Sequence, residues 1–483
     1  MTNNSTHFAV IITGPKYINH FYKLGKRLKK NYGCSITYVA ENAYEIYKEG
    51  YEELFDNEKT CYISDFTGQR TSDSIDWCSV FSSYDRISTY HYNFAPSQYE
   101  IFVHAVYCLW NHLFAIEKID GIIYENVSNT LSYVGQLKCK EHGKKYIGSC
   151  AVGWLPGRRL TLCHDITGEE RSRGNEIFNQ NNSQFDPEIA VILNKIKEPN
   201  IQPSYMTKDN PGSVHYPLVR NYLSKIHLIY RYLKFCISER EQIKNSFINR
   251  NPFINAYKLM IRELRRRWQF RLLFSRNLFD EVGEDEKFLI FPLHFHPEKS
   301  TSVNSWFAVD EYPVIRSVAF AIPDGYQLYV KVHPNGFGFH DSGYYEKLKR
   351  IPRVKLIDYK INGKELIGKS AGVVTLTSTM GFEALVLEKP VFLFGNMFYK
   401  CHPYCFKVDN NEFLPERIKS GLELVNSKEC AEKFHRYNLA LIDQELRLSF
   451  PAHYEFLNET GEQNIDEIAK HIFSSSERVS LTR

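Results

Sequence analysis

The chain has 483 residues, of which 43% are hydrophobic and 24% are charged, with 26 Gly and 19 Pro. At roughly 150 residues per domain this length predicts about three domains or two large ones, and the composition excludes collagenous and disordered chains. The net charge is +4, from 60 Lys and Arg against 56 Asp and Glu, so the overall charge favours no particular class of partner.

The first part of the chain alternates between short apolar runs and stretches with helical spacing. Strands are predicted at residues 8–12, 36–39, 121–124 and 146–148, and helices at 17–30, 101–116 and 130–142. Strands separated by helices indicate parallel βαβ units. The polar residues 1–7 and the short apolar run after them contain no signal-peptide core, and the eleven cysteines show no repeating short spacing. We therefore expect a reducing, cytoplasmic location.

The middle of the chain is polar and then strongly basic. Residues 164–216, rich in Asn, Pro, Gly and Gln, predict a long loop with one helix at 188–196. Residues 220–276 hold fourteen Lys and Arg against three Glu, and 257–274 predict an amphipathic helix with a basic side. That side could be a solvated face, a surface that docks on anionic membrane lipid, or a groove for an anionic polymer. Nucleic acid is the least favoured partner, because no recognition motif accompanies the charge.

A second alternating half begins at about residue 285. Strands are predicted at 288–293, 326–332, 354–356, 372–376 and 391–394, with helices between them and a largely helical stretch at 412–446. The fold class is therefore predicted to be α/β of GT-B type, with two facing Rossmann-like domains and a cleft between them. The expected boundaries are 1–163 and 285–440 for these domains, 164–284 for a loop and basic helical linker, and 441–483 for a helical tail.

Two strand ends of the second half carry side chains suited to an anion. Lys331, His333 and Pro334 stand where a strand leaves the sheet at its carboxyl edge, the edge at which ligands bind in open α/β folds. A structural histidine at a strand end is the alternative for His333. Ser378 and Thr379 precede a helix predicted from Gly381, whose free amides suit a phosphate. Ordinary N-capping is the alternative for these hydroxyls.

Glu383 follows Thr379 by four residues, so the pair does not form the standard capping box, and the carboxylate is available to meet a ribose.

These segments, with Lys389-Pro390-Val391 and Gly395-Asn396-Met397, resemble the capsular polysaccharide biosynthesis proteins that include the β-Kdo transferases. The resemblance covers about residues 288–400. It implies that His333, Ser378 and Thr379 hold the phosphate of a CMP-activated sugar, with Lys331, Pro334, Gly381 and Glu383 also in the donor site.

Glu298 is the predicted catalytic carboxylate. It lies after the strand at 288–293, in a segment where the family places an acidic residue before a small hydroxyl residue; the Kdo transferases have Asp there. A carboxylate at this strand end could attack an anomeric carbon or accept a proton from an acceptor hydroxyl. The alternative is a solvated loop glutamate paired with Lys299.

The first half offers three further candidates. Glu125 follows the strand at 121–124 and could act on the acceptor, while Arg158 and Arg159 could hold the carboxylate of an acidic sugar bidentately. The alternative is two surface arginines and a strand-end carboxylate satisfied by nearby amides. Both segments are similar to the weaker amino-terminal signature of the same family.

Neither a metal nor a cofactor is expected. Cys401 and Cys405 form one pair without a second, which is weak evidence for zinc, and the chain contains no P-loop or HExxH motif.

The resemblance implies a metal-independent glycosyltransferase of bacterial capsule or lipopolysaccharide biosynthesis, which transfers Kdo or a related acidic sugar from a CMP-sugar to a glycan or glycolipid acceptor. If the basic helix at 257–276 docks on lipid, the enzyme would be peripheral at the inner membrane. The alternatives are a transferase of the same fold with a UDP-sugar or CDP-polyol donor, and a non-catalytic capsule assembly or export factor.

Overall fold

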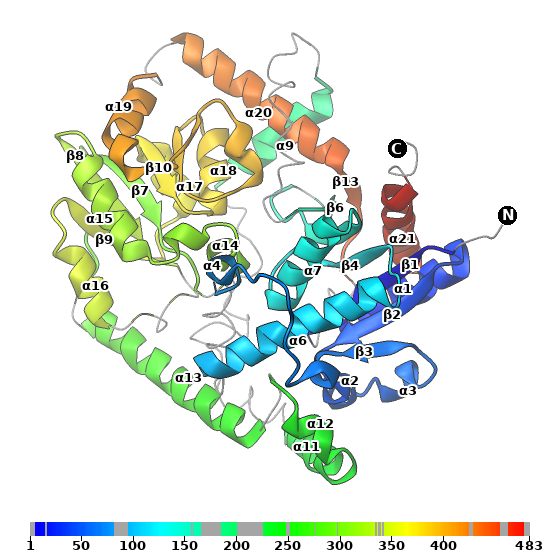
Figure 1. Ribbon diagram of the computed structural model, residues 1–483. Coiled ribbons are helices and arrows are strands. Elements are labelled where there is room, and N and C mark those ends of the chain that lie inside the picture. Colours follow the sequence, from blue (N-terminus) through cyan, green and yellow to red (C-terminus); the bar gives the residue numbers. More distant parts are fainter. Residues whose placement is uncertain are drawn as a thin grey trace.

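The computed structural model contains two sheets, each flanked by helices (Figure 1). It describes residues 5–14, 17–81, 95–155, 157, 159–165, 185–199, 226–247, 252–275, 277–296, 298–333, 336, 340, 342–424, 428–454 and 462–477.

The first sheet has seven strands in the order β13-β6-β5-β4-β1-β2-β3. They are β1 (His7–Ile11), β2 (Ser35–Ala40), β3 (Thr60–Tyr62), β4 (Gly121–Glu125), β5 (Lys145–Ala151), β6 (Arg159–Cys163) and β13 (Ser449–Pro451). Strands β1 to β5 run parallel, whereas β6 and β13 pair antiparallel at one edge. The central parallel strands are near-continuous apolar runs because helices cover both faces of the sheet.

Helices of the first half pack around this sheet. They are α1 (Ile18–Tyr32), α2 (Ala43–Lys48), α3 (Glu52–Phe55), α4 (Trp77–Phe81), α6 (Pro96–Ala115) and α7 (Thr130–Glu141), with a 3₁₀ turn at Ile63–Phe66. Helix α1 ends where Gly33 takes a left-handed φ of 64°, which lets its N–H bond to the C=O of Lys29. Glycine adopts this conformation without the steric cost that a Cβ would bring.

The second sheet has six strands, all parallel, in the order β12-β11-β10-β7-β8-β9. They are β7 (Lys287–Pro292), β8 (Tyr326–Lys331), β9 (Val354–Ile357), β10 (Gly372–Thr375), β11 (Val391–Leu393) and β12 (Cys405–Lys407). The order of connection reverses between β7 and β10, as it does between β1 and β4 in the first sheet. Both sheets are therefore doubly wound, and the predicted GT-B type α/β fold is confirmed.

The helices of the second half are α14 (Lys299–Ser302), α15 (Glu311–Ala321), α16 (Ser342–Lys349), α17 (Gly363–Lys369), α18 (Thr379–Val386), α19 (Leu414–Leu424) and α20 (Lys428–Leu448). Short 3₁₀ turns lie at Trp306–Ala308, Phe398–Cys401 and Asn411–Phe413. The end of β11 passes so close to the β10 loop that a Cβ on Gly395 would stand 2.5 Å from the C=O of Leu376. Only glycine permits this approach, which brings the two loops together.

Several segments join the two halves. Helix α9 (Pro187–Lys197) packs against α18 and α20, and it confirms the helix predicted at 188–196. Helices α11 (Ile226–Ser238), α12 (Arg240–Lys244) and α13 (Pro252–Ser275) follow, while 166–184 and 200–216 of the predicted loop lie outside the described residues. The predicted helical tail contains α21 (Glu462–Glu477), which packs on α1, but also β13, which extends the first sheet (Figure 1). The end of the chain thus returns to the first half.

Helix α13 is present as predicted, but its basic side is only partly exposed: Arg265 and Arg271 face solvent, whereas Arg266 does not. Arg266 and Gln269 are each only 3% exposed, whereas Trp268 is 61% exposed. Arg266 lies 3.4 Å from Glu263 on the same helix, and α13 packs against α16. A central arginine of the basic side therefore faces the protein, and an apolar side faces outward.

Candidate active site

The candidate site lies at the carboxyl ends of β7 and β10, the two strands between which the second sheet reverses. In open α/β sheets the helices on either side of such a point diverge, and ligands bind in the crevice that results. The loop after β7 carries His294, His296 and Glu298, and the loop after β10 carries Thr377 and Ser378. The strand order thus brings together two of the segments that the sequence singled out.

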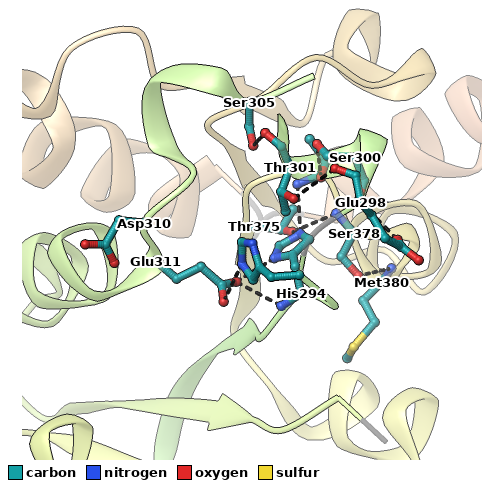
Figure 2. A network of polar contacts seen from close by, with 12 residues as sticks. His294, Glu298, Ser300, Thr301, Ser305, Asp310, Glu311, Thr375, Ser378 and Met380 are labelled. Carbon is teal, nitrogen blue, oxygen red and sulfur yellow. Dashed lines mark hydrogen bonds and ion pairs between the residues drawn. The ribbon is translucent and has the colours of Figure 1, made fainter. Parts of the chain in front are cut away.

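A buried carboxylate, Glu311, ties these two loops together. Its Oε1 accepts hydrogen bonds from the backbone N–H of His294 at 2.8 Å and from Nδ1 of the same residue at 2.7 Å. Nε2 of His294 in turn accepts a hydrogen bond from the backbone N–H of Thr377 at 3.1 Å. Because an amide can only donate, Nε2 carries no proton and His294 is the neutral Nδ1–H tautomer. Figure 2 shows the contacts between Glu311 and His294.

The histidines around Glu311 control its charge. Burial alone would raise the pKa of the Glu311 carboxyl, but its contacts with His294 and His296 outweigh burial and lower the pKa to about 2. Burial likewise lowers the pKa of His296, yet the interaction with Glu311 outweighs it and raises that pKa. Glu311 is therefore ionised throughout the physiological range.

Ser378 is the N-cap of α18. Its Oγ accepts a hydrogen bond from the N–H of Met380 at 3.2 Å, and its own N–H donates to Oγ1 of Thr375 at 2.9 Å. Its C=O accepts from the Tyr399 hydroxyl at 2.6 Å. Ser378 is therefore an N-cap, as the alternative interpretation predicted. The cap fixes the loop, and Thr379 in the first turn of the helix stays exposed. A preformed helix N-terminus with hydroxyls is suited to a phosphate.

Lys331 lies close to the first turn of α18. A Cβ on Gly363 would stand 4.0 Å from Cε of Lys331 and 3.6 Å from Cε of Met380, so this glycine lies between them. Nζ of Lys331 donates to the C=O of Tyr359 at 3.0 Å, and burial lowers the pKa of the amine to about 8. The side chain remains largely protonated at pH 7 and supplies a buried positive charge beside the helix N-terminus.

His333 follows Lys331 in the loop after β8. Its ring lies 6.1 Å from that of Phe295, and burial lowers the pKa of the imidazole to about 4. The imidazole is therefore neutral at pH 7 and can act as a hydrogen-bond donor to an anion without first losing or gaining a proton. Pro334 lies outside the described residues.

Glu298 is exposed and is the N-cap residue of α14. Its backbone C=O accepts from the N–H of Ser302 at 2.9 Å, and its carboxylate accepts from the Ser300 hydroxyl at 3.3 Å. The C=O of Ser300 accepts from Oγ1 of Thr377 at 2.9 Å. The predicted catalytic carboxylate is thus held by its backbone next to the β10 loop, with its side chain exposed (Figure 2).

The other two predicted residues of α18 differ in role. Burial raises the pKa of Glu383 to about 6, which leaves a carboxyl able to bind or release a proton near neutral pH. A Cβ on Gly381 would stand 2.4 Å from the Tyr399 hydroxyl oxygen. Gly381 is therefore required for the packing of α18 on Tyr399, whatever its relation to the donor.

The first half contributes in a different way from the prediction. Glu125 is 9% exposed at the end of β4, and its Oε1 accepts a hydrogen bond from the Ser128 hydroxyl at 2.5 Å. Arg159 donates to the C=O groups of Leu446 and Ser449, so its guanidinium holds β13 against β6. The structure does not bring Arg159 to the second sheet, and Arg158 lies outside the described residues.

Trp154, in the loop after β5, packs against the second half. Its ring stacks on that of Phe398 with centroids 4.4 Å apart and planes 4° apart, and it lies 4.6 Å from the ring of Phe382 on α18. This aromatic contact joins the loop after β5 to the helix that Ser378 caps.

The sequence analysis missed His294 and Glu311 as site residues. The signal available was the His-Phe-His spacing directly after a buried strand, which places two imidazoles on one side of the extended chain. No sequence pattern identified Glu311, because acidic residues are common in the first turn of a helix.

Residues 248–413 match the family described as capsule polysaccharide biosynthesis protein. The resemblance predicted from the sequence is thereby confirmed for this part of the chain. No curated protein matches the sequence.

Among solved structures, the β-Kdo 2,4 transferase KpsC of Thermosulfurimonas dismutans is 16% identical over 63% of this chain and 79% of its own, with a TM-score of 0.33. The β-Kdo 2,7 transferase KpsC of the same organism is 13% identical over 69% of this chain and 84% of its own, with a TM-score of 0.29. The Neisseria meningitidis UDP-GlcNAc 2-epimerase bound to UDP-GlcNAc is 12% identical over 92% and 99%, with a TM-score of 0.28. The family resemblance therefore rests on the sequence match, and the fold on the strand order.

Proposed function

Because residues 248–413 carry the sequence pattern of capsule polysaccharide biosynthesis proteins, we propose that this protein is a glycosyltransferase of bacterial surface polysaccharide synthesis. It would transfer Kdo or a related acidic sugar from a CMP-activated donor to a glycan or glycolipid acceptor. One observation of the structure supports the proposal most directly. Hydrogen bonds through Glu311, His294 and Thr377 connect the loop after β7, which carries the catalytic candidate, to the loop after β10, which carries the phosphate-binding hydroxyls.

The donor phosphate would bind at the N-terminus of α18. Thr379 and Ser378 provide hydroxyls, Lys331 provides a buried positive charge, and His333 provides a neutral N–H donor. The phosphate of the donor is a diester with one negative charge, and CMP gains a second when the bond to the anomeric carbon breaks. These groups offset the charge present at the start and the charge that develops. The same groups therefore stabilise the departing CMP, and the reaction needs one additional carboxylate.

Glu298 would supply that carboxylate by one of two routes. As a nucleophile, its oxygen bonds to the anomeric carbon while the bond from that carbon to the phosphate oxygen breaks. The acceptor oxygen then bonds to the anomeric carbon as the Glu298 carboxylate departs, the hydroxyl proton passes to the phosphate of CMP, and configuration is retained. As a base, it takes the proton of the acceptor hydroxyl as that oxygen attacks and CMP leaves, and configuration is inverted.

Two alternatives differ from the proposal in what they bind. A transferase with a UDP-sugar or CDP-polyol donor would use the same helix N-terminus but another nucleotide, and a non-catalytic export factor would bind glycan alone. Titration calorimetry with CMP, UDP and CDP separates them. We expect CMP to bind most tightly; tighter binding of UDP or CDP would favour the other transferases, and no nucleotide binding would favour the export factor.

Substitution of His333 tests the phosphate site itself. A hydrogen bond to a charged phosphate contributes about 1.5–3 kcal/mol, so His333→Ala should weaken CMP binding roughly tenfold to a hundredfold. The control is His471→Ala, which removes a half-exposed histidine on α21, outside the second sheet and its loops. This variant should keep the wild-type affinity for CMP. Unchanged CMP affinity in a His333→Ala protein that melts like wild type would remove His333 from the donor site.

We also propose that α13 attaches the protein to the surface of an anionic membrane. The partner is the one predicted from the sequence, but the contact would be made by the exposed apolar side of the helix and not by its basic side. The exposed apolar surface of α13 consists of Phe253, Ile254, Tyr257, Met260, Ile261, Leu264 and Trp268. Arg265 and Arg271 are exposed on the same helix. Figure 1 shows α13 on the outside of the molecule. Aromatic and aliphatic side chains next to arginines are typical of helices that lie in a lipid interface.

Among the described residues, no helix combines the length and the apolar character that crossing a bilayer requires. The proposed attachment is therefore tested as surface binding. Burial of a large apolar side chain contributes about 1.5–3 kcal/mol, so Trp268→Glu should reduce binding to vesicles of phosphatidylcholine and phosphatidylglycerol roughly tenfold or more. Phe413→Glu, which changes an exposed aromatic on another element, should bind like wild type. Equal sedimentation of both variants with the vesicles would contradict the proposal.

A further inference from the structure

A second group of side chains surrounds the other oxygen of Glu311. Oε2 of Glu311 makes no hydrogen bond within the described part of the chain, although its side chain is 0% exposed. Nε2 of His296 lies 3.1 Å from it, in a direction that does not form a hydrogen bond. One ligand atom each from His296, Glu311 and His340 lies within 4.8 Å of the other two. Two imidazoles and a carboxylate thus converge on one point.

We propose that His296, Glu311 and His340 bind a divalent transition-metal ion. Two histidines and one carboxylate are a recurring ligand set for zinc and related metals, with water in the remaining positions. With metal–ligand bonds of about 2.1 Å, tetrahedral ligands stand roughly 3.4 Å apart. The spacing between His296 and Glu311 is already close to this value. Small side-chain rotations would bring His340 to the same distance.

The surroundings of the three residues fit a cation. Glu311 is oriented by the two hydrogen bonds that its Oε1 receives from His294, which leaves Oε2 directed at His296 and provides the outer-shell support that metal ligands require. The ring of His340 stacks on that of Tyr344 with centroids 4.0 Å apart, which fixes its plane. Asp310 and Glu298 add negative charge near His296.

The ion would connect three separate segments: the loop after β7, the first turn of α15, and His340, which precedes α16. Because Glu311 also holds His294, and His294 accepts from the N–H of Thr377, the ion would stabilise the loop that ends in Ser378. Its role is therefore structural support of the site. This differs from the metal independence expected from the sequence, where only the Cys401 and Cys405 pair was considered.

The alternative explanation for this cluster is that no metal binds and that His296 is protonated and forms an ion pair with Glu311. A proton would involve His296 and Glu311 alone, whereas a metal ion would also take His340 as a ligand. The two explanations are distinguished by titration with a spectroscopically visible metal.

The test is titration of the full chain, treated with chelator and then desalted, with Co²⁺. Visible absorption reports the ligand environment, and thiolate ligands give an additional near-ultraviolet band. We expect one tightly bound Co²⁺ per chain without the thiolate band, together with a rise in melting temperature on binding. The thiolate band matters because the chain has eleven free cysteines that could hold metal elsewhere.

Variants assign the bound ion to this site. His296→Ala and His340→Ala should each weaken Co²⁺ binding by about a hundredfold or more and abolish the rise in melting temperature. His471→Ala is the matched control, because Nε2 of His471 also lies 2.9 Å from a carboxylate, that of Glu467, but forms only a pair. It should retain full affinity.

Wild-type Co²⁺ affinity in both His296→Ala and His340→Ala would overturn the proposal, as would a bound ion with the thiolate band alone. Neither outcome depends on the glycosyl donor, so failure here is distinguishable from failure of the proposed activity.

Discussion

Glu298→Gln is expected to retain CMP binding while turnover falls by roughly a hundredfold to ten-thousandfold, the range that a positioned acid–base or nucleophilic group contributes. Gln keeps the size of the side chain and removes its charge. A carboxamide neither attacks an anomeric carbon nor accepts a proton from a hydroxyl. Because the Glu298 backbone C=O, and not its side chain, caps α14, the loop should keep its structure. Calorimetry with CMP and a nucleotide-release assay measure the two effects separately.

The control for this substitution is Glu365→Gln, which changes an exposed glutamate in the first turn of α17. It should turn over donor at the wild-type rate. If Glu298→Gln does the same, Glu298 is not the catalytic carboxylate, and Glu125 is the next one to test.

Mass spectrometry separates the two roles of Glu298. Enzyme incubated with donor and a poor acceptor should carry one added sugar on the peptide containing Glu298 if the residue is the nucleophile. If it is a base, no adduct forms and Glu298→Gln is still inactive.

Glu311→Ala is expected to lower the free energy of unfolding by about 1–3 kcal/mol, the usual cost of leaving buried hydrogen-bond donors without their acceptor. The substitution leaves both the N–H and the Nδ1–H of His294 without their acceptor. It should also weaken CMP binding, because His294 positions the N–H of Thr377 next to Ser378. Denaturant unfolding of both proteins with chelator present measures the loss, and Glu365→Ala should be close to neutral.

The difference between wild type and Glu311→Ala should depend on pH in one direction. The pKa of Glu311 is about 2 in the folded protein, and in the unfolded chain it is near the ordinary value for glutamate, about 4.5. The unfolded state therefore binds the proton more readily, and the stabilisation by Glu311 is complete above about pH 4.5. It is lost as the pH falls toward 2. A difference that stays constant from pH 6 to pH 3 would show that Glu311 is not held ionised by its histidines.

The fold was predictable because its signals are local. Each central strand is a short apolar run bounded by turn residues, and each helix that follows has its own periodicity. Strands β3, β6, β12 and β13 were missed, and all four lie at or next to an edge of their sheet. Strand β13 also pairs with β6 from a distant part of the chain, and its place is decided by packing of the folded protein.

Helix α13 illustrates a different limit. Periodicity identifies two faces of a helix but not which face meets the protein. We expected the arginines to face outward because charged groups favour water. In the structure, Arg266 is buried beside Glu263, and Trp268 is exposed. The contact of α13 with α16, which decides this, is a tertiary contact that the local pattern does not contain.

The candidate site was predictable where it lies in contiguous motifs. Ser378, His333 and Glu298 stand at strand ends that the alternation pattern locates. The Glu311–His294–Thr377 connection was not predictable, because it depends on a tautomer and on three segments brought together by the strand order. Arg159 was misplaced for a similar reason: its partners, Leu446 and Ser449, lie nearly three hundred residues further along the chain.

Nucleotide release from a panel of nucleotide sugars tests the central claim most directly. Purified protein is incubated with CMP-Kdo, other CMP-sugars, UDP-sugars and a CDP-polyol, each with and without a capsule or lipopolysaccharide acceptor glycan. The account predicts release of CMP from CMP-Kdo or a related acidic CMP-sugar that depends on the acceptor, with the sugar recovered on the glycan. Acceptor-dependent release from UDP-sugars alone, or no release from any donor, would contradict it.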